Sequence, residues 1–397
     1  MPAVDFTQPR GVDILAQMIQ TVVTAEELEP EEEEEVVESL GPGRRPSLKV
    51  LFVETNLQVQ DLVSKLYQTA SSSTRIRNLL DSFLPQVTPK GDGYFLLSFK
   101  EREMGRPFQY LIRVGDGAWE VYTIERATDV VRTFRRMVED SDLLDMAWVP
   151  REKLDRIVEE LVSPDAVSGF TAKRHTGWSR KRVTVRVFGG DRADLGTARK
   201  YFHSEPTAVY FKKTHSPEVA LLGTLIDNGE LRIDKIAPDA IDDFTQTEAA
   251  ISTRIVTLEY GKLFGGFRGG VVGQLGSAVV RGDSGEVLGE VPRGYHTIVF
   301  RISDQYWHEA LEASIRSVFV DGKEGSFLGY EFSPGVIRTY DQVFGGSFDV
   351  RMDPEEKSVM VDPLPGATEK SISNLSRIFI DRIEHSAKLE SVHQVFW

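Results

Sequence analysis

The sequence predicts an α+β fold of repeated units, each an antiparallel sheet with helices on one face, preceded by a flexible acidic N-terminal segment. Two observations lead to this class. Strand-like and helical runs recur three times in one order, which is strand, helix or helices, about three strands, and helix. The 397 residues also suffice for roughly two to four domains of about 100–200 residues each. We expect the units at residues 48–165, 166–276 and 277–397, after an N-terminal segment of residues 1–47.

The composition is that of a globular protein. With 41% hydrophobic and 10% aromatic residues, the chain is too apolar to be disordered as a whole. The absence of cysteine excludes disulfides, thiolate catalysis and cysteine-ligated metal sites. There is no run of about eighteen apolar residues, and the N-terminus lacks a basic leader followed by an apolar stretch. We therefore expect a cytoplasmic protein without a membrane partner.

The N-terminal segment combines a short helix with an acidic linker. Apolar residues at helical spacing, from Ile14 to Val23, predict an amphipathic helix over residues 11–23, which is a candidate docking site for a protein partner. Residues 1–47 hold eleven acidic and three basic residues, so that −8 of the total net charge of −14 lies here. Like charges repel, and proline and glycine break regular structure, so a flexible linker is predicted after the helix.

The first unit begins with a strand at residues 48–54. Apolar spacing predicts helices next, then three strands separated by glycine-rich turns, then further helices. The predicted helices cover residues 57–70, 74–87, 128–140 and 142–161, and the predicted strands cover residues 94–99, 109–114 and 118–124.

The second unit has a hairpin signal, Asp-Asn-Gly at 227–229, and a long predicted helix over residues 239–264. Its other predicted elements are a helix at 192–202 and strands at 182–188, 207–213, 219–226 and 230–236. The third unit is predicted to contain a hairpin at 277–291, strands at 295–303, 326–332, 346–352 and 358–364, and helices at 304–319 and 371–389. The order within a unit is similar to that in one half of the TATA-binding-protein type of fold and to that in several other small α+β folds. That resemblance covers element order and no sequence motif.

One segment is strongly basic. Residues 171–213 contain eleven basic and three acidic residues, a net charge of +8, with aromatic residues interleaved. On the predicted strand 182–188, alternation places three valines on one face, which should face the core, and on the other, solvated face Arg182, Thr184, Arg186 and Phe188. The candidate nucleic-acid-binding residues are Lys173, Arg174, Trp178, Arg180, Lys181, Arg182, Arg186, Arg192, Arg199, Lys200, Lys212 and Lys213.

The basic segment has three interpretations. Phosphates attract clustered bases, and exposed aromatic rings stack on nucleobases, which favours a nucleic acid or another polyanion. The segment is equally suited to dock an acidic protein segment. One such segment is this chain's own residues 26–38, which would then compete with an anionic partner. The third interpretation is a solvated basic face without a special role.

Two segments contain the glycines typical of phosphate-binding loops, but neither is expected to bind a phosphate. The sequence Gly-Gly-Asp-Arg-Ala-Asp-Leu at 189–195 lies at a strand-to-helix junction, but Asp191 and Asp194 occupy the cap and first turn. They are expected to satisfy the helix amides and to repel anions. Residues 261–276 are rich in glycine but match neither the Walker spacing nor the dinucleotide-binding spacing, so we expect a loop there. The alternatives are a substrate-facing loop or a single RNA contact through Arg268.

Two further motifs resemble catalytic signatures. Gly282 to Gly285 resembles the nucleophile motif of chymotrypsin-like serine proteases, but Glu286 stands where that family has glycine, and a turn is expected. Glu355 and Lys357, with Asp341 and Asp349 upstream, resemble the metal-binding set of PD-(D/E)xK nucleases. Because they follow Pro354 between two predicted strands, they are expected at a hairpin tip.

These patterns nominate no catalytic residue, metal ligand or cofactor. The seven histidines show none of the short spacings typical of metal sites. The leading prediction is a non-catalytic protein that binds nucleic acid or another polyanion through residues 173–213. The first alternative is an interaction or scaffold subunit of a larger complex, and the second is a metal-dependent nuclease.

Overall fold

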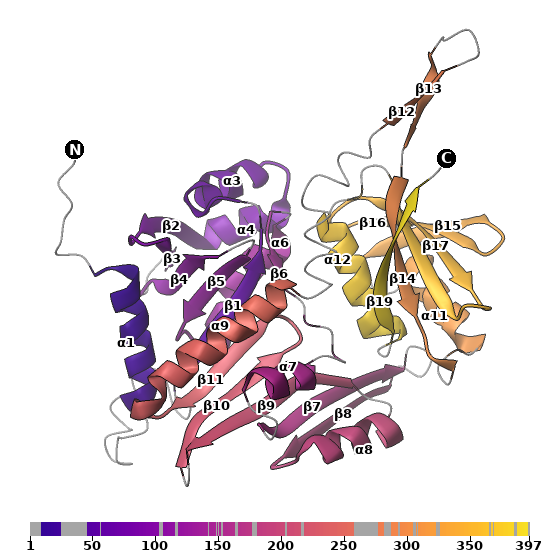
Figure 1. Cartoon of the computed structure of the whole chain (residues 1–397). Helices are drawn as coiled ribbons and strands as arrows, with labels where there is room; N and C mark the ends of the chain where they lie inside the picture. The colour runs from indigo at the N-terminus through magenta and orange to yellow at the C-terminus, as the bar shows by residue number, and fades with distance from the viewer. Residues whose placement is uncertain are drawn as a thin grey trace. The chain divides into compact units, whose positions relative to one another are not determined.

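The computed structural model describes residues 9–24 and 46–395 with gaps. The gaps are 56, 103–105, 116–117, 142, 148, 150, 152–153, 163–165, 177–180, 203–204, 216–217, 258–276, 282–286, 293, 305–306, 308, 323–325, 365–366, 368 and 385–386. The fold is mixed α+β with antiparallel sheets and several helices, which confirms that part of the predicted class (Figure 1). The chain divides into two compact units, Met1–Thr171 with Arg186–Leu195 and Pro206–Leu258, and Ala172–Val185 with Gly196–Glu205 and Glu259–Trp397.

A large sheet of eleven described strands dominates the first part of the chain. Its order is β2-β3-β4-β5-β1-β11-β10-β9-β7-β8, with β6 paired to β1. The strands are β1 (Leu48–Glu54), β2 (Phe83–Pro89), β3 (Tyr94–Glu101), β4 (Phe108–Val114), β5 (Ala118–Thr123), β6 (Asp145–Met146), β7 (Val167–Thr176), β8 (Lys181–Phe188), β9 (Glu205–His215), β10 (Glu218–Ile226) and β11 (Glu230–Ile236). The β1–β11 pair, in register at Leu48 and Ile233, joins the strands of residues 48–165 and 166–276 into one sheet.

The helices in the first part of the chain are mostly short. They are α1 (Gly11–Thr24), α3 (Leu62–Thr69), α4 (Thr74–Ser82), α5 (Ala127–Val130), α6 (Arg136–Asp140), α7 (Leu154–Leu161), α8 (Arg192–Phe202) and α9 (Ile241–Thr257). A π-helical turn, Val131–Arg135, connects α5 to α6. The predicted hairpin at 227–229 is confirmed, since β10 and β11 pair and Gly229 takes a φ of 71°.

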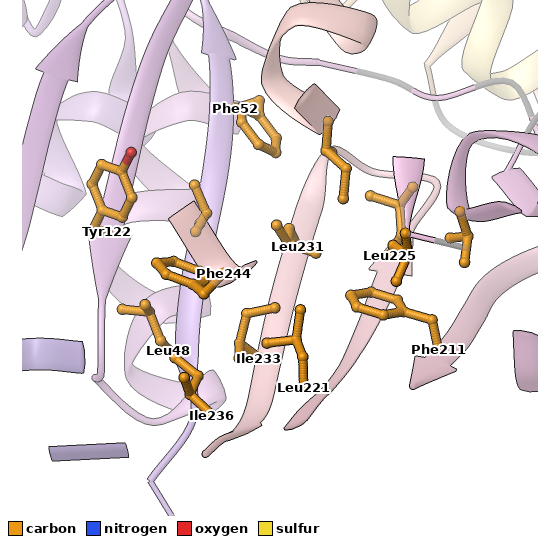
Figure 2. Packing of buried hydrophobic residues seen from close by; sticks show 14 of the residues in the cluster. Leu48, Phe52, Tyr122, Phe211, Leu221, Leu225, Leu231, Ile233, Ile236 and Phe244 are labelled. Atoms are coloured by element: carbon orange, nitrogen blue, oxygen red, sulfur yellow. The ribbon is translucent and has the colours of Figure 1, made fainter. Parts of the chain in front are cut away.

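Apolar residues on both sides of the sheet are buried in two clusters. One cluster includes Leu51, Leu97, Tyr110 and Phe134. The other joins strands to helices α1, α7 and α9, and its packing is shown in Figure 2, where Tyr122 and Phe244 are labelled among its members. Its members on α1 are Met18, Ile19, Val22 and Val23. The apolar stripe of the predicted N-terminal helix therefore packs into the core of its own chain, which confirms the helix and occupies its apolar face.

The prediction of one helix over 74–87 is wrong in its second half. Helix α4 ends at Ser82, and the chain continues as strand β2, which pairs with β3 along its whole length. Pro85 and Pro89 cannot donate backbone hydrogen bonds, and they are tolerated because β2 is the edge strand of the sheet. Phe83 and Pro85 are buried and the residue after each of them is exposed, which is the alternation expected of a strand. The predicted helix over 142–161 is also shorter, beginning at Leu154.

A second sheet lies in the C-terminal part, in the order β15-β16-β17-β18-β14-β19. Its strands are β14 (Gly294–Arg301), β15 (Phe327–Ser333), β16 (Val336–Asp341), β17 (Ser347–Asp353), β18 (Ser358–Pro363) and β19 (Lys388–Val395), and its helices are α11 (Glu309–Phe319) and α12 (Glu369–Ile378). A separate hairpin, β12 (Ser277–Arg281) with β13 (Val287–Pro292), confirms the predicted hairpin at 277–291. The predicted closing helix is too long, because Glu384 is extended and β19 pairs with β14.

The helices of this part cover one face of the second sheet. The rings of Phe300 on β14 and Phe379 after α12 stack at a centroid distance of 3.9 Å. Phe319 at the end of α11 meets Phe327 on β15 edge-on, with their ring centroids 5.3 Å apart.

The strand order β15-β16-β17-β18-β14 of the second sheet matches the order β2-β3-β4-β5-β1 of the first sheet. Among the described residues, no helix is both long and apolar enough to cross a membrane.

Candidate nucleic-acid interface

Strand β8 presents an exposed polar and aromatic face. Thr184, Arg186 and Phe188 are exposed, whereas Val185 and Val187 between them are partly buried. This is the alternation that the sequence predicts for a strand with one face toward the core. Phe188 is unusual among them, because 75% of its side chain is open to solvent. An exposed ring of this size on a sheet face is a candidate stacking surface.

The ring of Phe188 stacks on that of Tyr210 in strand β9. Their centroids are 5.5 Å apart and their planes differ by 28°. Strand β7 lies between β8 and β9, and Gly169 occupies the position beneath the two rings. A Cβ atom at Gly169 would lie 3.2 Å from the Tyr210 ring and 2.4 Å from the carbonyl oxygen of Val187. The Tyr210 hydroxyl is also fixed by a 2.8 Å hydrogen bond with the Thr171 hydroxyl.

A basic residue lies on each side of this aromatic pair. Strand β7 is antiparallel to β8, because only residues 177–180 separate the two strands in the sequence. It is also antiparallel to β9, because the Lys212 amide donates to the Ala166 carbonyl oxygen and the Thr207 hydroxyl donates to the Thr171 carbonyl oxygen. Strands β8 and β9 therefore run in the same direction.

Arg186 precedes Phe188 by two residues and Lys212 follows Tyr210 by two, so the cations extend from opposite ends of the stack. Both side chains are exposed. Along the strand direction they are separated by about 13 Å at about 3.3 Å per residue. We call Arg186, Phe188, Tyr210 and Lys212 the aromatic–basic surface.

Several predicted binding residues lie elsewhere or are already paired. Lys213 points to the opposite face from Lys212 and forms a 2.5 Å ion pair with Asp243 of helix α9. Arg199 is partly buried and donates to Glu205 at 2.8 Å. Lys200 is exposed and lies over the neighbouring Tyr201 ring at 5.3 Å.

The remaining candidates fall outside what the structure describes. Trp178 and Arg180 lie between β7 and β8, in the gap 177–180. Strands β7 and β8 and helix α8 contain the backbones of five further candidates, whose side chains are not among the described ones: Lys173, Arg174, Lys181, Arg182 and Arg192. The acidic residues 26–38 and the glycine-rich residues 261–276 also lie outside the described residues.

The helix α8 N-terminus is capped as the sequence predicts. The Asp191 carboxylate accepts from the backbone amides of Ala193 at 2.8 Å and Asp194 at 3.1 Å. The Asp194 carboxylate accepts in return from the Asp191 amide at 3.1 Å. This reciprocal pair is a capping box built from two aspartates, and it uses the amides that a phosphate would need.

The motif around Glu355 and Lys357 lies at a hairpin tip, as predicted. The backbone amides of Glu355 and Glu356 donate to the Asp353 carboxylate in the turn between β17 and β18. Asp349 forms two 2.8 Å bonds with Arg338. The described residues contain no group of three or more His, Cys, Asp or Glu side chains arranged to hold a metal ion.

Asp341, the other upstream carboxylate of that motif, is fully buried. It accepts from the Val343 amide at 2.8 Å and from the Asn374 side chain at 2.9 Å. A buried carboxylate satisfied by such donors holds a turn and a helix in place.

A cluster of ionisable groups that the sequence does not reveal lies under helix α9. Glu248 of α9 and Glu120 of β5 both accept from the Tyr122 hydroxyl at 3.0 Å. Arg113 of β4 lies between the two carboxylates and pairs with both. Burial, and secondly the charge of Glu120, raises the pKa of Glu248 to about 7, although Arg113 opposes this. All these groups are wholly or largely buried, so the cluster fixes the helix to the sheet.

The chain matches no protein-family model, and a comparison with curated proteins gives no match. Of the described features, the aromatic–basic surface combines exposure with a specific side-chain geometry. It is therefore the candidate site on which a functional proposal rests.

Proposed function

We propose that this protein binds single-stranded nucleic acid through the aromatic–basic surface. The observation that carries the proposal is the stacked Phe188–Tyr210 pair, which holds an exposed ring between two exposed cations. A nucleobase adds to such a stack through its π face, which every base possesses. Arg186 and Lys212 are then placed to contact phosphates on either side of the stacked base.

Single strands suit this surface better than duplexes. In a duplex the π faces of the bases are covered by their neighbours, so an aromatic platform on a sheet gains little from it. An unpaired strand exposes these faces. Its phosphates also supply the negative charge that the two cations attract, against a net charge of −14 for the whole chain.

An acidic protein segment is the competing ligand for the same cations. It would bind Arg186 and Lys212 but would gain little from an exposed phenylalanine. The aromatic ring therefore separates the two ligands, because a loss of affinity in Phe188→Ala is expected for a stacked base and is not expected for a carboxylate-rich peptide.

The test is a fluorescence-anisotropy titration of the full chain with labelled single-stranded RNA, single-stranded DNA and duplex DNA at two salt concentrations. Phe188→Ala should weaken single-strand binding about 5- to 150-fold, which corresponds to about 1–3 kcal/mol per stacked base. Arg186→Ala/Lys212→Ala should weaken it and reduce the salt slope by about 1.4, at about 0.7 per phosphate contact in a single strand.

Matched controls are available on other elements. Tyr67→Ala removes an exposed ring from helix α3, and Lys65→Ala/Arg156→Ala removes two exposed bases from α3 and α7. Neither should change affinity by more than about twofold. The proposal fails if single strands do not bind, or if the control variants weaken binding as much as the surface variants do.

We propose as well that the acidic residues 26–38 compete with the nucleic acid for the basic segment. Deleting residues 1–45 would remove helix α1 and its buried side chains, so the suitable change is Glu31 to Glu35 replaced by glutamine. Affinity should then rise, and more at low salt, where charges are less screened. Equal affinity of the two proteins at low salt would exclude the competition while leaving the binding site itself unaffected.

A further inference from the structure

The edge strand β15 of the second sheet exposes a row of large apolar side chains. Leu328, Tyr330 and Phe332 alternate along the strand, and Tyr340 on β16 lies opposite Leu328. Each of the four side chains is between 50% and 56% exposed. They lie on the face away from α11, since Phe327 and Thr339, which point the other way, contact Phe319. We call these four residues the β15 patch.

Strand β15 also ends the sheet, so one side of its backbone pairs with no strand among the described residues. Proteins normally protect such edges with charges, proline, bulges or a covering element. Here a register irregularity with β16 occurs at Phe332, near the strand end, which leaves Phe327–Glu331 as a regular edge. A long apolar edge of this kind is a template for another strand.

The charges around the patch are neutralised within the same unit. Arg338 forms two 2.8 Å bonds with Asp349, and its guanidinium lies 3.9 Å from the Phe332 ring. Glu331 accepts from Arg316 at 3.1 Å. A ligand of strong positive or negative charge would therefore find little to pair with. A neutral apolar surface is the complementary partner, and the β15 patch itself is such a surface.

We propose that two copies of this chain associate by antiparallel pairing of their β15 strands around a two-fold axis at Tyr330. This register places Phe327–Ser333 of one copy opposite the same residues of the other, with regular pairing at Gly329–Glu331 and the irregularity at Phe332 near each end. Tyr330 lies opposite Tyr330, and Leu328 opposite Phe332, which are favourable cross-strand pairs. Glu331 lies opposite Gly329, so no like charges face one another directly. The interface is isologous, as closed dimers require.

The area available indicates a reversible dimer. Edge-to-edge pairing covers the flanks of Leu328, Tyr330 and Phe332, whereas Tyr340 lies one strand further from the axis and stays open. With the paired backbones the total stays below about 1,200 Å², the range of weak and transient complexes. We therefore expect a dissociation constant in the micromolar range, about 1–100 µM.

The first experiment is sedimentation velocity of the full chain from about 1 to 100 µM. We expect a concentration-dependent shift from monomer to dimer. Tyr330→Lys places two like charges on the axis and should raise the dissociation constant at least tenfold, with circular dichroism confirming that the variant is folded. Tyr67→Lys, at an equally exposed tyrosine of α3, is the matched control and should dimerise normally.

The second experiment uses the absence of cysteine from the chain. In Tyr330→Cys the two thiols face one another across the axis and should form a disulfide-linked dimer under mild oxidation, because directly opposed Cβ atoms lie within about 5.5 Å. Tyr67→Cys should remain largely monomeric. A monomer throughout the concentration range, a dimer that Tyr330→Lys leaves intact, or a Tyr330→Cys dimer that does not cross-link would each overturn the proposal.

Discussion

Phe188 and Tyr210 stack on one another although their strands are not neighbours. Their ring centroids are 5.5 Å apart across strand β7, which lies between β8 and β9. Side chains on strands two places apart are normally separated by about 9–10 Å and by the side chain between them. The contact exists because Gly169 has no side chain. A glycine in β7 therefore determines the geometry of a surface formed by residues of two other strands.

Gly169→Ala should disrupt this arrangement and destabilise the protein. The new Cβ would lie 2.4 Å from the Val187 carbonyl oxygen, a backbone atom that can move only with its strand. We expect the free energy of unfolding to fall by about 1–3 kcal/mol, as for other overpacked positions, and the proposed affinity for single-stranded nucleic acid to fall with it. Urea denaturation and the anisotropy assay measure the two effects. Unchanged stability would show that the β7–β8 pair adjusts at no cost.

Gly196→Ala is the counterpart on helix α8 and should stabilise the protein. Nothing lies within 4 Å of a Cβ atom at this position, and alanine is the better helix former. The free energy of unfolding should rise by about 0.5–1 kcal/mol in the same urea experiment. A loss of stability would mean that the α8 backbone at this position has a conformation that alanine cannot adopt.

Features set by neighbouring residues were predictable from the sequence. The two-residue period of β8 gives the exposed face that carries Arg186 and Phe188, and the spacing of Asp191 and Asp194 gives the cap of α8. The hairpin at 227–229 follows from its turn residues in the same way. Each of these depends on interactions within a few residues, which a sequence pattern records.

Features set by distant residues were not predictable. Strand β2 follows directly on helix α4, and its two prolines are tolerated only because it lies at an edge, which the strand order decides. Lys212 and Lys213 are adjacent and identical in type, yet one is exposed and the other pairs with Asp243 of α9. The Phe188–Tyr210 stack likewise requires knowing that β7 separates their strands.

Glu248 should make stability fall as the pH rises from about 5 to 8. Its folded-state pKa of about 7 lies above the ordinary value of 4.5, so the folded protein binds the extra proton between these two values. Folding is therefore favoured below this window, and the cost of ionising the buried carboxylate is complete above it. The expected loss between pH 5 and 8 is about 2 kcal/mol, at 1.36 kcal/mol per pKa unit, measured by urea denaturation at each pH.

Glu248→Gln should remove this part of the pH dependence, because the amide oxygen still accepts from Tyr122 but cannot ionise. Glu139→Gln, at an exposed glutamate of α6, is the control and should keep the slope of the unchanged protein. If Glu248→Gln keeps the full slope as well, the carboxylate is ionised in the folded state near its ordinary pKa, and Arg113 outweighs both burial and Glu120.

Lys49 should act in the opposite direction at higher pH. Burial lowers the pKa of its ammonium from 10.5 to about 8, although the neighbouring carboxylates of Glu230 and Asp234 oppose the shift. Between these two values the unfolded chain binds more protons, so stability should rise with pH. The expected gain is about 2 kcal/mol from pH 7 to 9.5.

Lys49→Met removes the charge that causes this rise and should abolish it. The control, Lys65→Met, replaces an exposed lysine of α3 and should leave the rise intact. The Lys49 ammonium donates to the carbonyl of Glu125 at 2.7 Å and to Ser47 Oγ at 3.1 Å. Methionine cannot replace these bonds, so the variant also loses stability at pH 9.5, where the lysine is largely neutral. A variant that is less stable by the same amount at pH 7 and 9.5 would show that the hydrogen bonds matter and that the buried charge carries no penalty.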